Sequence, residues 1–365
     1  MPVSNGTWNY NSTLWQLEGS QATQMQRKCA MESGNSKSGG GRPRNQRLAS
    51  AIAGLTLIVG SLPFTRLAHA EPPKTNPYLV VLGIAQDAGY PHAGCRRACC
   101  MTAWNDPGKK QMVTCLALVD PVTKQRWMFE ATPDFPHQLE SLNKITGFDS
   151  DTKQPNLAGI FLTHAHIGHY SGLMYLGRES LGARKVPVYA MPRMRDFLRD
   201  NGPWSQLLGL ENIELQPLVA DNESKLNERI SVKPILVPHR DEFSETVGFV
   251  IRGPNRSALF LPDIDKWEKW ETKIESVIAT VDYAFVDATF YDNAELPNRD
   301  ISEIPHPFIV ESMKRFEKLP ESERKKIHFI HLNHTNQAIQ ADSEATKTIV
   351  GSGMAVARFG MISEL

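Results

Sequence analysis

The sequence has no excess of charge of either sign, because 40 Lys and Arg residues balance 40 Asp and Glu residues. A nucleic-acid-binding protein normally carries a basic excess, so the composition indicates no nucleic-acid partner. The sequence also shows no internal repeat of the length that builds solenoids or propellers. Its 365 residues are enough for one large domain or two small ones.

Long apolar runs are also missing. The apolar stretch at residues 48–62 is too short for a comfortable membrane span. It follows the basic segment 42–47 and precedes Ala68-His69-Ala70, which is the order of regions in a secretory signal peptide. We therefore predict a signal peptide at residues 48–70 and a periplasmic or secreted protein. The alternative is an uncleaved anchor, which would be the only membrane contact.

The segments on either side of this signal differ in composition. Residues 1–47 are rich in Ser, Asn, Gln and Gly, and we expect disorder there. The folded domain is predicted at residues 77–365.

Cysteines are few, but three of the five fall within six residues. His92, Cys95, Cys99 and Cys100 have the donor types of a structural zinc site, which is usually a closed tetrahedron of four N and S ligands. A disulfide is the alternative, since a location outside the cytoplasm permits one. Cys115 falls in an apolar run and is expected to be a buried small side chain.

Short apolar runs dominate the rest of the chain and alternate with helical segments, which indicates an α/β fold. Helices are predicted at residues 193–200, 267–278 and 307–316. The predicted strands are residues 78–84, 113–119, 126–131, 157–162, 186–190, 213–215, 230–237, 246–251, 258–261, 283–286 and 327–330. Histidine or aspartate recurs where these strands end, and strand ends in a layered fold converge on one edge that carries the chemistry.

Three histidines follow the run at residues 157–162: His164, His166 and His169. Imidazole is the commonest protein ligand for zinc. The spacing resembles the His-x-His-x-Asp-His signature of the metallo-β-lactamase superfamily, with Gly168 where the family has Asp. The resemblance implies a four-layer αββα sandwich with its metals at the edge of the sheets.

The same resemblance implies the ligand sets. The first metal would bind His164, His166 and His239. Asp263 would be the bridging carboxylate, and the second metal would bind His169, Asp263 and His331. His334 is a further candidate ligand, either in place of His331 or in the position left by Gly168. The predicted catalytic residues are Asp263 and His334. Asp265 is expected to cap a helix instead.

Gly168 leaves the number and identity of the metals open. The site would hold one or two zinc ions, or iron, which imidazole also suits. The Gly-rich Asp87-Ala-Gly-Tyr-Pro91 stretch, the cysteine cluster and Leu332-Asn-His-Thr-Asn336 are similar to the branch of pyrroloquinoline quinone biosynthesis protein B.

The leading hypothesis is a hydrolase outside the cytoplasm that cleaves a small ester, amide, lactone or phosphodiester with metal-bound hydroxide. The alternatives are an iron-dependent oxygenase or hydroxylase and a non-catalytic metal-binding protein.

Overall fold

The structure is a computed structural model that describes residues 71–148, 154–297, 300 and 303–365. These residues belong to one compact unit, Thr65–Leu365. The predicted disordered segment at residues 1–47 and the predicted signal peptide at residues 48–70 lie outside the described residues. Among the helices of the described part, none has the length and apolar character needed to cross a bilayer.

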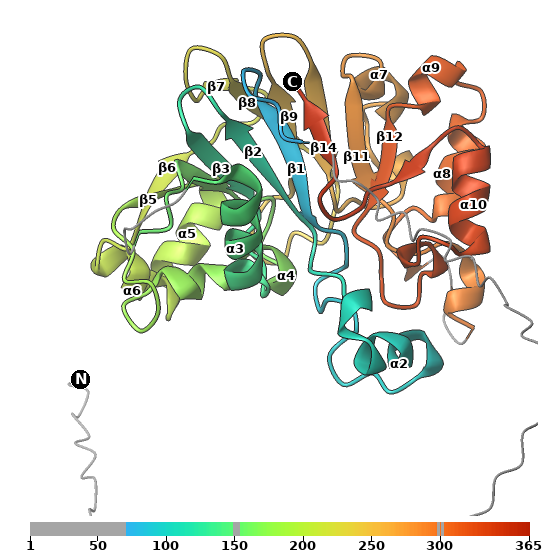
Figure 1. The fold of residues 1–365 in the computed structure, drawn as a ribbon, viewed down its shortest axis with the longest axis horizontal. Coiled ribbons are helices and arrows are strands. Elements are labelled where there is room, and N and C mark those ends of the chain that lie inside the picture. Colours follow the sequence, from blue (N-terminus) through green and yellow to red (C-terminus); the bar gives the residue numbers. More distant parts are fainter. Residues whose placement is uncertain (1–70, 149–153, 298–299, 301–302) are drawn as a thin grey trace, which may run out of the picture. The chain divides into compact units, whose positions relative to one another are not determined.

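Two seven-stranded mixed sheets form the centre of the described unit (Figure 1). The first has the order β14-β1-β2-β3-β4-β5-β6, and the second has the order β13-β12-β11-β10-β9-β8-β7. The strands are β1 (Tyr78–Gly83), β2 (Cys115–Asp120), β3 (Gln125–Phe129), β4 (Gly159–Phe161), β5 (Val186–Ala190), β6 (Ile213–Pro217), β7 (Ser224–Lys225), β8 (Ser231–Leu236), β9 (Val247–Arg252), β10 (Ser257–Leu261), β11 (Tyr283–Asp287), β12 (Ile327–Ile330), β13 (Ala355–Val356) and β14 (Ile362–Glu364).

The two sheets pack against each other through aromatic side chains. Phe129 of β3 lies 5.0 Å from Phe161 of β4 and 5.5 Å from Phe249 of β9, measured between ring centroids. Successive side chains of a strand point to opposite faces, so strands buried on both faces are apolar throughout. In β1, Leu79 belongs to the core that includes the second sheet, while Tyr78 belongs to a core shared with helix α3 (Phe135–Thr146).

Helices cover the outer faces of both sheets, which completes the predicted αββα sandwich (Figure 1). The α-helices are α2 (Ala98–Asn105), α3 (Phe135–Thr146), α4 (Ile167–Tyr170), α5 (Pro192–Asp200), α6 (Trp204–Gly209), α7 (Ile274–Ile278), α8 (Ile309–Phe316), α9 (Glu321–Arg324) and α10 (Glu344–Gly351).

The helix predicted at residues 267–278 is wrong in its length. A 3₁₀ turn, Trp267–Lys269, and the short helix α7 replace it. The indole N–H of Trp267 donates to Ser312 and that of Trp270 donates to the carbonyl of Leu236. These tertiary contacts of two tryptophans three residues apart take the place of a continuous helix.

Parallel pairing brings several strand ends to one edge. Strands β10, β11 and β12 are parallel neighbours. Asp263 follows β10, Asp287 ends β11 and His331 follows β12. Because the carboxyl ends of parallel strands share an edge, these three side chains are placed at one edge of the second sheet.

Candidate metal centre

The first half of the centre consists of four predicted residues. His164 and His166 lie in the loop between β4 and α4, His239 follows β8, and Asp263 follows β10. One ligand atom from each lies within 4.8 Å of the others. His164 and Asp263 are buried, whereas His166 is partly exposed. The structure thus brings together the predicted ligands of a first metal.

The second half contains two predicted histidines and one aspartate that was not predicted. His169 lies on α4 and His331 directly after β12, and both are fully buried. The third member is Asp87, in the loop after β1. Ligand atoms of Asp87, His169 and His331 lie within 4.8 Å of one another.

One oxygen of Asp263 joins the two halves. Its Oδ2 atom lies 3.4 Å from His164 Nε2, 3.3 Å from His239 Nε2, 3.7 Å from His169 Nε2 and 4.0 Å from His331 Nε2. The prediction that Asp263 is the bridging carboxylate therefore agrees with its position between two histidine pairs. The histidine pairs come from both sheets, and Asp263 comes from the second.

Asp87 occupies the space that a side chain at position 168 would fill. A Cβ atom on Gly168 would lie 2.2 Å from Asp87 Oδ1 and 2.5 Å from Asp87 Cα. Asp87 Oδ1 is itself 3.2 Å from His169 Nε2. A carboxylate is thus present beside His169. It comes from the loop after β1, whereas the superfamily signature has its aspartate at position 168.

Each of the five histidines points one ring nitrogen out of the centre, toward a hydroxyl or carboxylate group of another residue. Such outer partners fix the orientation of a metal-binding imidazole. The pairs are His164 with Thr163 (2.9 Å), His166 with Glu242 (3.0 Å), His169 with Glu130 (3.3 Å), His239 with Asp265 (3.4 Å) and His331 with Thr289 (3.0 Å). Asp265 is thus a partner of His239. The prediction that Asp265 caps a helix is wrong, because the turn that follows has Lys266 at its N-cap position and no side-chain cap.

The backbone is strained at two of these positions. His331 has φ 68° and Glu130 has φ 84°, in the left-handed region that L-residues rarely adopt. Strain of this kind costs on the order of 1–3 kcal/mol and tends to occur at functional sites. Here it aims a ligand in one case and its buried carboxylate partner in the other.

Opposite charges set the ionisation of the centre. Burial lowers the pKa of His239, but Asp263 and Asp265 outweigh burial and raise it to about 9. Burial raises the pKa of Asp87, but the nearby His169 and His331 outweigh burial and leave it below its usual range. Burial also raises the pKa of Asp263, but the surrounding histidines outweigh burial and lower it, so Asp87 and Asp263 are held as anions.

His306 and Asp287 support the bridging carboxylate from behind. Nδ1 of His306 lies 3.1 Å from Asp263 Oδ1 and 2.9 Å from Asp287 Oδ2. Burial lowers the pKa of His306, but the two carboxylates raise it to about 10. This pair escaped prediction, although Asp287 ends a predicted strand and follows the same rule as Asp263.

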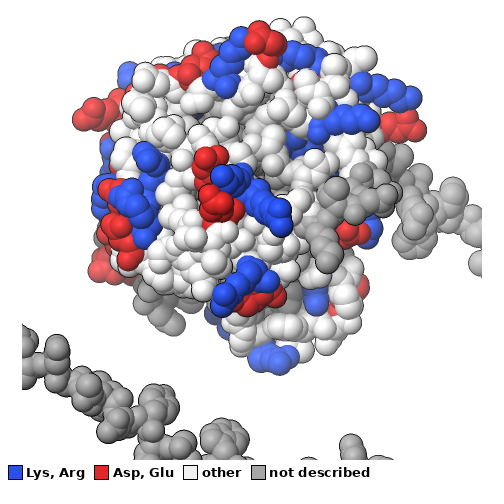
Figure 2. Space-filling model, turned by 90° about the vertical axis from the view of Figure 1, so that its left-hand side faces the viewer, with Lys and Arg blue, Asp and Glu red and all other residues white. Residues whose placement is uncertain are grey.

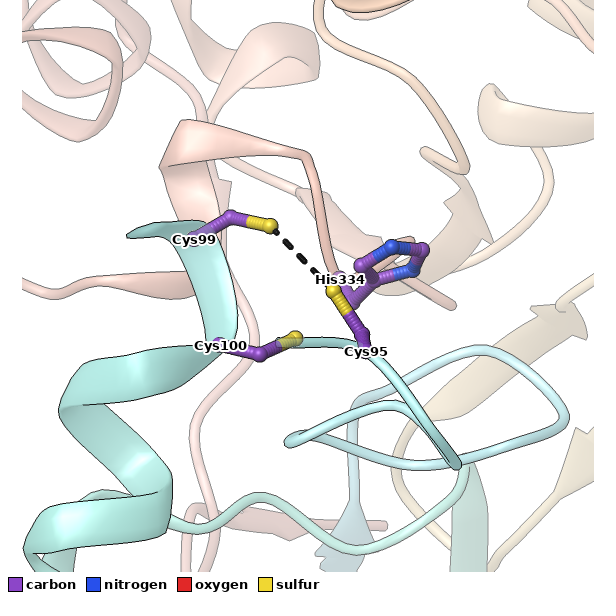
Figure 3. Close-up of side chains that lie close together, drawn as sticks. All are labelled: Cys95, Cys99, Cys100 and His334. Atoms are coloured by element: carbon purple, nitrogen blue, oxygen red, sulfur yellow. Dashed lines mark hydrogen bonds between the residues drawn. The ribbon is translucent and has the colours of Figure 1, made fainter. Parts of the chain in front are cut away.

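The cysteine cluster contains Cys95, Cys99, Cys100 and His334, whose ligand atoms lie within 4.8 Å of one another (Figure 3). The Sγ atoms of Cys95 and Cys99 are 3.8 Å apart, and the described cysteines are free. Zn–S bonds of about 2.3 Å in a tetrahedron place two sulfurs about 3.8 Å apart. A disulfide would need about 2.05 Å, so the geometry matches a shared zinc ion.

Two predicted positions need correction. His334 lies with the cysteines and not in the histidine centre, because it is three residues beyond His331 on a loop that turns toward α2. His92 is not among the four donors. Its backbone N–H donates to Cys100 Sγ at 3.4 Å, and its ring lies 4.3 Å from that of His334, measured between centroids, and is tilted by 43°. The cluster therefore takes its nitrogen ligand from a distant part of the chain.

The residues present fit metal ions at both places. Buried polar atoms without a hydrogen-bond partner include Asp87 Oδ1, His169 Nε2, His239 Nε2, His331 Nε2 and Asp263 Oδ1. Unpaired buried polar atoms are costly, and a concentration of them indicates a missing ion or ligand. The five atoms named above all belong to the histidine centre, and they are imidazole nitrogens and carboxylate oxygens, which bind zinc or iron.

Comparison with known proteins places this geometry in a family. A profile described as "Beta-lactamase superfamily domain" matches residues 118–341. The chain belongs to the metallo-β-lactamase superfamily. Within it, the chain is similar to the branch of coenzyme PQQ synthesis protein B.

Two relatives represent this branch. Coenzyme PQQ synthesis protein B of Methylorubrum extorquens (strain PA1) is 21% identical over 307 residues, which cover 79% of this chain and 100% of that protein. The protein of the same name from Methylococcus capsulatus (strain Bath) is 24% identical and covers 77% of this chain and 97% of that protein.

Solved structures share the fold. The zinc-bound PqqB of Methylobacterium extorquens superposes with a TM-score of 0.68 at 19% identity, and covers 79% of this chain and 100% of that chain. A diphosphatase from the PhnP family superposes with a TM-score of 0.57 at 22% identity, and covers 80% and 98%. These likenesses agree with the predicted four-layer sandwich.

Proposed function

We propose that the protein is a metal-dependent hydrolase that acts outside the cytoplasm on a small ester, amide, lactone or phosphodiester. The observation that carries the proposal is the arrangement of four imidazole nitrogens within 4.0 Å of Asp263 Oδ2. Hydrolases that use two metals need such a shared anion to hold two cations a few ångströms apart. The superfamily fold agrees with this chemistry, although fold alone does not determine function.

The chain's own residues divide the work between two ions. His164, His166 and His239 would hold the first, Asp87, His169 and His331 the second, and Asp263 would contact both. Ions held there supply a Lewis acid and lower the pKa of water toward neutrality. Asp87 has the negative charge and the position needed to orient a water beside the second ion.

A cavity of about 870 Å³ opens beside Asp87 and would receive the substrate. Its lining includes Trp104, Ile167 and Met174, which are exposed by 37%, 66% and 55%. Exposed apolar side chains around a catalytic group favour a ligand with an apolar part. Substrates with an acyl chain or an aromatic substituent therefore fit the cavity better than small inorganic esters.

The surface charge agrees with a small-molecule substrate. On the face drawn in Figure 2, basic and acidic side chains of the described residues lie intermixed. The whole chain has a formal net charge of zero. A nucleic-acid substrate would instead be held by a continuous basic surface.

Zinc is the proposed metal in both places. Three thiols and an imidazole favour zinc over iron in the cysteine cluster. The histidine centre has donors that suit either zinc or iron. The similarity to coenzyme PQQ synthesis protein B keeps an iron-dependent oxygenase as the second candidate for that centre.

The test is elemental analysis and activity of the full chain purified without chelator. The substrates are 4-nitrophenyl butyrate, an N-acyl homoserine lactone and bis(4-nitrophenyl) phosphate. Hydrolysis that zinc restores after chelation, and that Asp263→Asn abolishes, supports the proposal. Iron in the centre together with consumption of oxygen and no hydrolysis would overturn it in favour of the oxygenase.

The location outside the cytoplasm is part of the proposal and is supported by the order of charge and apolarity in residues 42–70. Expression of the full chain in a bacterial host, followed by fractionation and N-terminal sequencing, tests it. A mature protein that starts near Glu71 in the periplasm supports export. An intact N-terminus in the cytoplasm overturns it.

A further inference from the structure

The second half of the metal centre and the cysteine cluster share two loops. One loop follows β1, carries Asp87 and Cys95, and leads into α2, whose first turn contains Cys99 and Cys100. The other follows β12 and carries His331 and, three residues later, His334. Figure 3 shows His334 of this second loop beside Cys95, Cys99 and Cys100, and their ligand atoms lie within 4.8 Å of one another. Each loop therefore supplies ligands to both sites.

Hydrogen bonds join the two loops on the near side of Asp87. The backbone N–H of Leu332 donates to Ile84 O at 2.8 Å, and that of Gln86 donates to Leu332 O at 2.9 Å. The side-chain amide of Asn333 donates to Gln86 Oε1 at 2.6 Å. These bonds hold residues 84–86 beside residues 332–333, immediately before Asp87.

The cysteine cluster joins the same loops on the far side of Asp87. Between Asp87 and Cys95 the chain contains Gly89 and Gly94, with φ 71° and 73°. Glycine has the least restricted backbone of all residues, so this stretch needs other contacts to hold it in one conformation. Tyr90 OH donates to Cys99 O at 2.7 Å and accepts from Gln340 at 2.8 Å. Two backbone bonds between Tyr90 and Gln111, of 2.8 and 3.0 Å, also hold the middle of this stretch. An ion at the cluster would add a further attachment at Cys95, beyond Gly94.

The carboxylate of the second half depends on this loop because it is not part of the histidine motif. A carboxylate at position 168 would be carried by α4, next to His169 in sequence. Here Asp87 fills that space instead, 3.2 Å from His169 Nε2. The second half therefore has one ligand on α4 and two on the loops that the cysteine cluster joins.

We propose that the ion bound by Cys95, Cys99, Cys100 and His334 sets the affinity of the second half of the histidine centre, because it fixes the loops that carry Asp87 and His331. The inference rests on the proposed function, because it requires that the histidine centre binds metal. None of the ligands of the first half lies on either loop. The first half is connected to the second only through Asp263, which follows β10. The cysteine cluster is thus a positioning site for one of two catalytic ions.

The test is a zinc titration of the metal-free full chain against a competing chelator, with stoichiometry checked by elemental analysis. The wild-type protein should bind three ions. The double variant Cys95→Ser/Cys99→Ser should retain one tight ion and bind a second about 10–100-fold more weakly, the size expected when support around metal ligands is lost. Two tight ions with unchanged affinity in this variant would overturn the inference.

A matched control and a second measurement guard against a folding defect. Cys115→Ala removes a cysteine that is buried in β2 and outside the cluster, and it should bind three ions as the wild type does. Coupling between sites is reciprocal. Asp87→Asn should therefore weaken the ion of the intact cysteine cluster by a similar factor, whereas unchanged cluster affinity contradicts the coupling.

The outcomes separate this inference from the proposed function. If the wild-type protein binds only one ion, at the cysteines, then the proposed metal centre fails. If the wild type binds three and the double variant binds two tightly, only the coupling fails.

Discussion

The histidine centre and the cysteine cluster are built from the same kinds of strand-end loops but differ in their chemistry. The cluster has three thiols and one imidazole, which is a complete tetrahedral set for zinc and leaves no position for a substrate. The histidine centre has seven donors, carboxylates behind them and a cavity beside Asp87. The difference shows that donor type and access, more than location in the fold, separate a structural site from a reactive one.

Loss of the shared negative charge of Asp263 should have the largest effect on this contrast. In Asp263→Asn the anion between the two histidine pairs is removed, so both ions of the centre are weakened. Since a metal Lewis acid contributes several kcal/mol to catalysis, we expect kcat/KM to fall at least ~1,000-fold. The measurement is steady-state hydrolysis together with zinc content. Asp282→Asn, in an aspartate that accepts from Ser257 N–H, is the control; equal activity in the two variants contradicts the assignment.

Removal of an outer carboxylate should affect one half of the centre more than the other. Glu130→Gln leaves His169 without its anionic partner, and Asp265→Asn does the same to His239. We expect each change to weaken the corresponding ion by ~10–100-fold. Calorimetric zinc titration distinguishes the two ions by affinity. If both variants weaken the same ion, the division into two halves is wrong.

Changes in the cavity wall should affect substrate binding and leave the metals in place. Ile167→Asp puts a charge on an apolar side chain that is 66% exposed and lines the cavity. Burial of such a side chain against a ligand contributes about 1.5–3 kcal/mol, so KM for 4-nitrophenyl butyrate should rise about 10–100-fold. Val122→Asp, at a turn residue that is 61% exposed, is the matched control. A rise in KM in both variants would exclude a specific role for the cavity.

A charged pair outside both sites gives the smallest expected effect. Arg315 contacts Glu275 at 2.6 Å; burial raises the pKa of Glu275, but the hydrogen bond to Arg315 outweighs burial and lowers it. The pair therefore stabilises the fold above the unfolded-state pKa of Glu, and this contribution is lost as pH falls through the lower folded-state pKa. Arg315→Met should cost about 0–1 kcal/mol at pH 7. Urea unfolding at pH 7 and pH 3 measures it; a difference that grows toward pH 3 contradicts the sign.

Much of the fold followed from local patterns. The predicted strand at residues 186–190 matches β5, and those at 258–261 and 327–330 match β10 and β12 to within a residue. Apolar runs of this length are buried on both faces wherever they lie, so the pattern is visible locally. Helix α3 was not predicted. The helix at residues 267–278 was predicted too long, because contacts of Trp267 and Trp270 with distant residues decide the conformation of that segment.

The site was predictable where ligands lie close together in sequence or follow an obvious strand. His164, His166 and His169 form a motif, and His239, Asp263 and His331 follow apolar strands. Asp87 also follows a strand, but nothing local links it to position 168. Only the close approach of its backbone to Gly168 shows that it takes the place of the missing carboxylate.

The sequence by itself determined the alternation of apolar strands, the three-histidine motif and the concentration of cysteines, because each depends on neighbouring residues. The tertiary structure alone decided that His334 joins the cysteines, that Asp87 joins His169 and His331, and that Asp265 supports His239. These assignments depend on which loops meet at the edge of two sheets. That meeting is set by strand order and by packing over long sequence separations, which no local spacing records.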